Sequence, residues 1–142
     1  MNKKASSLIV AIAFFVLATI LFLLPGSAIP APNWWTPFFK LIGFDKWVHT
    51  TIFFVLVYLW CRTIFLRTKG AKAKTNFIII LALFITYGIL IEFVQQHFIE
   101  NRSFEIFDIA ADAGGAFIGY IVSLKRFLKK ETPVETGVVN QN

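Results

Sequence analysis

The sequence predicts an all-α integral membrane protein, a four-helix bundle whose N- and C-termini both lie in the cytoplasm. Three observations lead to this prediction. Of the 142 residues, 57% are hydrophobic and only 15% are charged, whereas soluble domains carry about 25% charged residues. Four long apolar stretches recur along the chain. The basic residues gather on one side of these stretches, as the positive-inside rule requires of cytoplasmic segments.

Each apolar stretch has close to the roughly 20 residues that a helix needs to cross the hydrocarbon core of a bilayer. Because backbone groups in lipid must be hydrogen-bonded within their own segment, we predict that each stretch is helical. The expected helices cover residues 5–24, 46–66, 76–98 and 105–127. We expect residues 1–130 to form this transmembrane domain and residues 131–142 to form a disordered cytoplasmic tail.

The first stretch, Leu8 to Leu24, follows a lysine pair and precedes small residues, so it also resembles a secretory signal. Its apolar run exceeds the roughly 7 to 15 residues of a signal's hydrophobic region, and we expect the helix to be retained. Four of the five prolines follow in residues 25–37, where they prevent another spanning helix. We interpret this tryptophan-rich loop as a membrane-surface anchor, with a lid over a pocket as the alternative.

The basic residues set the orientation of the predicted helices. Eleven of the fourteen flank the N-terminus, the link between the second and third helices, or the end of the fourth. The other three are Lys40, Lys46 and Arg102. The larger group is cytoplasmic by the positive-inside rule. The basic excess is therefore a topology signal, so we expect membrane lipids as partners and no nucleic acid.

Polar stripes run along the last three predicted helices. An ionisable residue at mid-bilayer costs about 2.5 to 3.5 kcal/mol on insertion scales, so each one needs a reason to be there. Residues at helical spacing share a face, and counting from the helix ends, at about 1.5 Å per residue, brings the three stripes to one level in the outer third of the membrane. The candidate binding site therefore comprises Asp45, Lys46, His49, Glu92, Gln95, Gln96, Arg102, Asp108 and Asp112.

The fourth helix carries a stripe of small residues in line with its acids. Asp108, Asp112, Gly115 and Gly119 follow helical spacing. Small residues let membrane helices approach closely. We therefore expect this stripe to face the bundle interior and to turn both carboxylates away from lipid.

Two interpretations of the polar cluster remain open. In the first, a self-satisfied network joins the helices, with Arg102 clamping two carboxylates and His49 hydrogen-bonded to Asp45. In the second, a water-accessible pocket at the outer face binds a polar headgroup or a cell-envelope precursor, and Arg102 suits a phosphate or carboxylate. A catalytic form of this pocket would use a carboxylate as general base with a histidine partner. The catalytic candidates are Glu92, His49, Asp108 and Asp112.

A divalent metal is a weaker alternative for the same cluster. Its ligands would be Asp45, His49, Glu92 and Asp108, but the sequence has no established metal-binding motif. The single cysteine, Cys61, excludes a multi-cysteine zinc or iron-sulfur site. The sequence also has no glycine-rich phosphate loop, and we expect no cofactor.

These polar residues, in their order along the chain, resemble a known family. Asp45-Lys46-x-x-His49, then Glu92-x-x-Gln95, Arg102, and Asp108 on a glycine-bearing helix are similar to the VanZ-like family of small bacterial membrane proteins. The similarity runs from the tryptophan-rich loop to the end of the fourth predicted helix. One position departs from the pattern, because the family commonly has Asn where this chain has Asp112.

The resemblance implies a multi-pass protein of the bacterial cytoplasmic membrane and an association with low-level resistance to the glycopeptide teicoplanin. It supplies no established catalytic residues. We therefore predict that the outer-face pocket binds or acts on a cell-envelope precursor or a glycopeptide-related ligand. The alternatives are a membrane-embedded hydrolase or transferase using the Glu, Asp and His side chains, and a structural helper of a larger envelope complex.

Overall fold

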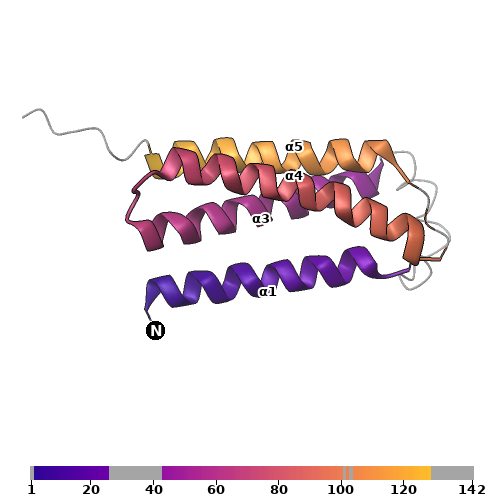
Figure 1. The fold of residues 1–142 in the computed structure, drawn as a ribbon, viewed down its shortest axis with the longest axis horizontal. Helices are drawn as coiled ribbons and strands as arrows, with labels where there is room; N and C mark the ends of the chain where they lie inside the picture. Colours follow the sequence, from indigo (N-terminus) through magenta and orange to yellow (C-terminus); the bar gives the residue numbers. More distant parts are fainter. Residues whose placement is uncertain (1, 26–42, 101, 103, 129–142) are drawn as a thin grey trace, which may run out of the picture.

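The computed structural model describes residues 2–25, 43–100, 102 and 104–128, and these form a bundle of long helices (Figure 1). The helices are α1 (Lys3–Leu23), α3 (Phe44–Thr68), α4 (Ala73–Phe98) and α5 (Ile106–Ser123), with a π-helical turn, η2 (Leu124–Leu128), continuing α5. Each lies close to its predicted range. Residues 26–42, which hold the tryptophan-rich loop after Pro25, and the tail predicted at residues 131–142 lie outside the described residues.

The connection between α3 and α4 is a tight turn. Lys69 and Lys72 have φ values of 52°, and Gly70, between them, has a φ of 81°. A left-handed residue commonly ends a helix because it turns the chain back across the last carbonyl groups. Glycine adopts this conformation without a steric penalty. The short turn makes α3 and α4 antiparallel neighbours.

The start of α1, the turn between α3 and α4, and the end of α5 all lie at the same end of the bundle (Figure 1). The predicted topology requires this arrangement, because it assigns both termini and the middle loop to one side of the membrane. The assignment of that side to the cytoplasm stays a prediction.

The outer surface of the bundle is apolar. Ile9, Leu83 and Leu90 are 56%, 63% and 58% exposed, whereas soluble monomers seldom expose large contiguous apolar patches. Within the described residues, four helices are long and apolar enough to cross a membrane. The predicted fold class, an all-α membrane-spanning four-helix bundle, is confirmed.

The closest packing in the bundle is between α3 and α5. It depends on two glycines. A Cβ atom at Gly119 would lie 2.7 Å from the carbonyl oxygen of Phe54, and one at Gly115 would overlap the backbone of Thr50. Without side chains at these positions α5 lies directly on the backbone of α3, and this brings the acids of α5 to the basic residues of α3.

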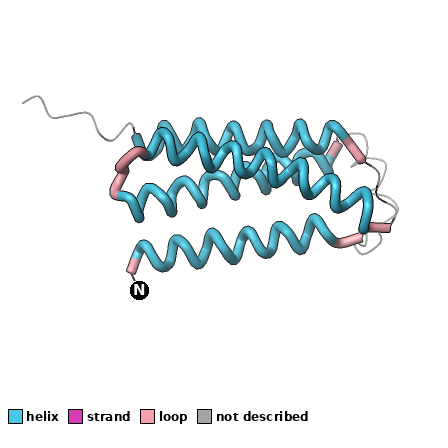
Figure 2. The backbone as a smooth tube through the Cα atoms, viewed as in Figure 1, coloured by secondary structure: helices cyan, strands magenta, loops and turns pink. Residues whose placement is uncertain are grey.

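The remaining helix, α1, packs mainly against α3 and to a lesser extent against α4. It lies on the side of the bundle away from α5 (Figure 2). Polar contacts tie it to both neighbours. Ser7 is hydrogen-bonded to Thr63 of α3 at 2.8 Å, and Thr19 to Tyr87 of α4 at 2.8 Å.

Candidate functional site

Seven polar residues meet at the end of the bundle opposite the start of α1 and the end of α5, and we call them the polar network. The start of α3, the end of α4 and the start of α5 all lie at this end, because the helices alternate in direction (Figure 1). Each of these helix ends contributes side chains, and one more comes from the residue just before α5. The polar network comprises Asp45, Lys46, His49, Glu92, Glu105, Asp108 and Asp112.

Lys46 is the positive centre of the outer part of the polar network. Its Nζ atom lies 2.6 Å from Asp45 Oδ2, 2.5 Å from Glu105 Oε2 and 2.7 Å from Asp108 Oδ1. The side chains of Asp45 and Glu105 are about half exposed, whereas that of Asp108 is 6% exposed. Since exposed ion pairs contribute little and buried charges need a partner, the contact with Asp108 matters most for stability.

His49 lies deeper and bridges the two acids of α5. Its Nδ1 atom is 2.9 Å from Asp112 Oδ1, and its Nε2 atom is 4.0 Å from Asp108 Oδ2. The ring of Phe22 covers the imidazole, with a centroid distance of 4.8 Å. His49 is therefore buried, with a carboxylate beside each ring nitrogen and an aromatic ring against it.

Glu92 and Asp112 each keep one carboxylate oxygen without a partner. Glu92 Oε1 accepts a hydrogen bond of 2.6 Å from the backbone N–H of Glu105. Glu92 Oε2 and Asp112 Oδ2 are buried and have no hydrogen-bond partner among the described residues. Both residues are only 2% exposed. A buried acceptor without a partner costs about 1–3 kcal/mol, so these two oxygens call for an explanation.

Gly88 makes room for Asp112 at the floor of the polar network. A Cβ atom at this position would lie 2.9 Å from Asp112 Oδ2 and 3.2 Å from the ring of Phe53. Gly88 was not among the residues predicted for the site. Glu105 was also missing from the predicted site, although it lies at helical spacing from Asp108 and this spacing could have indicated it.

Three of the predicted binding residues lie apart from the polar network. Gln95 is buried and donates a hydrogen bond of 2.8 Å to the carbonyl oxygen of Phe22, which satisfies an acceptor near the end of α1. Gln96 is exposed on the surface of α4. Arg102 forms no ion pair with any acid in the described part of the chain. Lys46 takes the clamping role that was expected of Arg102, and His49 bonds Asp112 where Asp45 was expected.

The structure also groups three acids in a way that could hold a cation. Oxygen atoms of Asp45, Glu105 and Asp108 all lie within 4.8 Å of one another. The ammonium of Lys46 lies among them and supplies the positive charge. This trio differs from the metal-ligand set predicted from the sequence, since it contains Glu105 and leaves out His49 and Glu92.

No curated protein and no solved structure gave a significant match. A family model described as VanZ/LLP1 matches residues 4–128, which include the whole polar network and the four helices except for Lys3. Because the match covers far more than half of the sequence, the chain belongs to the VanZ/LLP1 family.

Proposed function

We propose that the polar network binds the polar part of a cell-envelope component at the outer face of the bacterial cytoplasmic membrane, and that this binding lowers susceptibility to teicoplanin. One observation carries the proposal. Glu92 Oε2 and Asp112 Oδ2 are buried acceptors with no partner among the described residues. A network retained only to join helices gains no stability from such oxygens, whereas a ligand that donates hydrogen bonds would use them.

The charge of the polar network indicates which ligand groups it accepts. It contains five acids against one lysine and one histidine, so it has an excess of acceptors and negative charge. An ammonium, a hydroxyl or an amide N–H complements this surface. A phosphate does not, because Lys46 is already surrounded by three carboxylates.

The polar network also has a route to water. The side chains of Asp45 and Glu105 are 53% and 47% exposed, and Lys46 connects them to the buried Asp108. A ligand headgroup can therefore approach from the membrane surface. Displacement of the flexible Lys46 side chain would open the way to the buried acids.

A second candidate function, a membrane-embedded hydrolase or transferase, is favoured by the contact between His49 and Asp112. A carboxylate that holds one imidazole nitrogen orients the ring and leaves the other nitrogen free to exchange a proton. In this chain that other nitrogen, Nε2, faces Asp108 at 4.0 Å. The catalytic assignment would be His49 as general base, oriented by Asp112, with Glu92 and Asp108 binding the substrate.

The helper hypothesis has less support. It relied on the small-residue stripe of α5 as a docking surface for a larger envelope protein. Gly115 and Gly119 instead pack against the backbone of α3 within this chain. The small-residue stripe is therefore buried against α3 within this chain.

The test is teicoplanin susceptibility of a sensitive Gram-positive host that expresses wild type, Glu92→Gln or Glu100→Gln at matched membrane levels. Glu92→Gln keeps the Oε1 acceptor for the Glu105 N–H and replaces the unpartnered oxygen with an amide donor. Glu100→Gln is the matched control, because Glu100 is exposed and lies outside the polar network. We expect wild type and Glu100→Gln to raise resistance several-fold and Glu92→Gln to lose this effect. Equal resistance from all three chains would contradict the proposal.

A further inference from the structure

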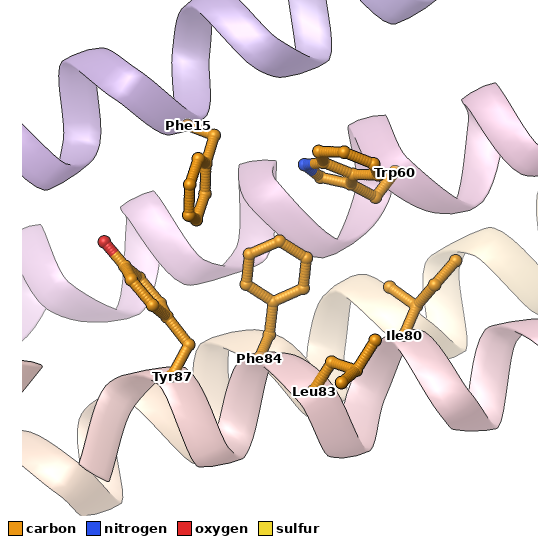
Figure 3. Close-up of a pocket in the computed structure, with 6 residues that line it drawn as sticks. All are labelled: Phe15, Trp60, Ile80, Leu83, Phe84 and Tyr87. Atoms are coloured by element: carbon orange, nitrogen blue, oxygen red, sulfur yellow. The ribbon is translucent and has the colours of Figure 1, made fainter. Parts of the chain in front are cut away.

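An apolar pocket of about 240 Å³ lies between α1, α3 and α4 (Figure 3). Side chains from all three helices point into the same space, and none of the polar network is among them. The lining residues are Phe15, Trp60, Ile80, Leu83, Phe84 and Tyr87.

The pocket opens to the lipid-facing surface of the bundle. Ile80 and Phe84 at its floor are 7% and 8% exposed, whereas Leu83 at its rim is 63% exposed. All three helices that form it are long and apolar enough to cross a membrane. Hydrocarbon chains therefore surround the opening, and water does not fill an apolar cavity of this kind.

A chain of contacting, mutually tilted aromatic rings connects the pocket with the polar network. Tyr87, which lines the pocket, lies 5.8 Å from Phe53. Phe53 lies 5.8 Å from Phe22, and Phe22 contacts His49 at 4.8 Å, all measured between ring centroids. Gly88, the residue after Tyr87, lies beneath Asp112. The pocket therefore begins directly below the buried carboxylates.

The pocket lies deeper than the polar network by a distance comparable to half the hydrocarbon core. Along α4, Tyr87 and Ile80 lie about 7.5 Å and about 18 Å deeper than Glu92, at a rise of about 1.5 Å per residue. Half of the hydrocarbon core is about 15 Å thick. A lipid whose head is at the level of Glu92 has its chain at the level of the pocket.

We infer that this pocket holds one hydrocarbon chain of a membrane amphiphile whose hydrogen-bond-donating head reaches the polar network. The position of the chain follows from the pocket itself, and the position of the head rests on the proposed function. The ligand class is then a lipid, or a lipid-linked envelope component, with an amine or hydroxyl head. The acid-rich polar network favours an ammonium head such as that of phosphatidylethanolamine over the anionic head of phosphatidylglycerol.

The test uses the full chain in vesicles of phosphatidylethanolamine and phosphatidylglycerol, with a trace of a photoactivatable lipid. The probe is phosphatidylethanolamine with a diazirine midway along one acyl chain, and peptide mass spectrometry locates the label. We expect label on the segments around Trp60 and Tyr87 to exceed several-fold the label around Phe117, which is 54% exposed on the lipid-facing surface of α5. Leu83→Trp fills the pocket from its exposed rim and should reduce this label several-fold. Leu90→Trp is the matched control on the lipid-facing surface of α4 and should leave it unchanged.

Label spread evenly over the exposed apolar surface, or label at Trp60 that persists in Leu83→Trp, would overturn the inference about the chain. The head is tested separately with a phosphatidylglycerol probe and with Glu92→Gln. Preference for the phosphatidylethanolamine probe that is lost in Glu92→Gln supports the full inference. Pocket label that is equal for both probes and unchanged in Glu92→Gln would overturn the head assignment and the proposed function, while the chain site stands.

Discussion

Gly115→Ala should destabilise the bundle by driving α5 away from α3. The new Cβ atom would lie 2.8 Å and 2.9 Å from the carbonyl carbon and Cα atom of Thr50. A backbone cannot rotate aside as a side chain can, so the whole helix must move. Overpacking costs about 1–3 kcal/mol, and a backbone contact belongs at the top of this range. Alanine recovers about 0.8–1 kcal/mol as the better helix former, which leaves a net loss of about 2 kcal/mol in the free energy of unfolding.

The neighbouring glycines provide matched controls. Gly114 has no atom within 4 Å of an added Cβ, so Gly114→Ala should be neutral or stabilise the helix by up to about 1 kcal/mol. Gly119→Ala would bring its Cβ to 2.7 Å from the carbonyl oxygen of Phe54 and should fall between the two. The assay is equilibrium unfolding in mixed detergent and sodium dodecyl sulfate micelles, followed by circular dichroism. Equal stability of the Gly114 and Gly115 variants would refute the packing argument.

Three further outcomes follow from the contacts of the polar residues. Lys46→Gln should lower the free energy of unfolding by about 3 kcal/mol, because buried Asp108 loses its closest positive partner. Asp45→Asn should change this free energy by less than about 1 kcal/mol, because the Asp45 side chain is exposed. Equal losses would contradict this assignment. The Lys46→Ala variant should bind one Mn²⁺ per chain among Asp45, Glu105 and Asp108, and wild type should bind none. Electron paramagnetic resonance measures the bound Mn²⁺. Equal binding by both chains would show that the Lys46 ammonium does not occupy this site. Tyr87→Phe should cost about 0.6 kcal/mol, typical of a hydrogen bond between membrane helices. Because Thr19 Oγ1 also donates to the Phe15 carbonyl oxygen, Thr19→Val has a loss of its own, but the double variant should lose less than the sum of the two single variants. Strictly additive losses would argue against the Thr19–Tyr87 hydrogen bond.

The fold was predictable because length and hydropathy dominate in a membrane. The requirement that backbone groups bond within their own segment leaves helix as the one solution for the four apolar stretches. The distribution of lysine and arginine predicted which ends of the helices lie together, and the structure shows that arrangement (Figure 1). The glycines of α5 indicated its packing face, and Gly115 and Gly119 contact α3 as expected.

The residues that make up the site were more predictable from the sequence than the contacts between their side chains. Helical spacing places Asp45 and His49 on one face, and Asp108 and Asp112 on another. Spacing within a helix does not determine which neighbour each side chain meets, since that depends on the rotation and axial shift of the helices. The contact of Gly115 with Thr50 sets this shift for α5. It aligns His49 with Asp112.

Two further features of the structure could not be predicted from the sequence, because they also depend on how the helices pack. The apolar pocket depends on how α1 lies against α3 and α4, and its lining residues look like ordinary lipid-facing side chains in the sequence. Glu105 precedes α5 and meets Lys46 and Glu92 only after the helices have packed. Both are products of tertiary packing.

The most direct test of the central claim compares Glu92→Gln with wild type in two quantities: the free energy of unfolding, and teicoplanin resistance at matched membrane levels. The neutral amide of the variant can still accept the hydrogen bond from the Glu105 N–H. It replaces a buried carboxylate that has one oxygen without a partner among the described residues. If the polar network is retained for ligand binding, the variant should be at least as stable as wild type and should lose resistance, since functional sites commonly reduce stability. A loss of about 2 kcal/mol or more, in parallel with resistance, would mean that Glu92 joins the helices as a structural residue.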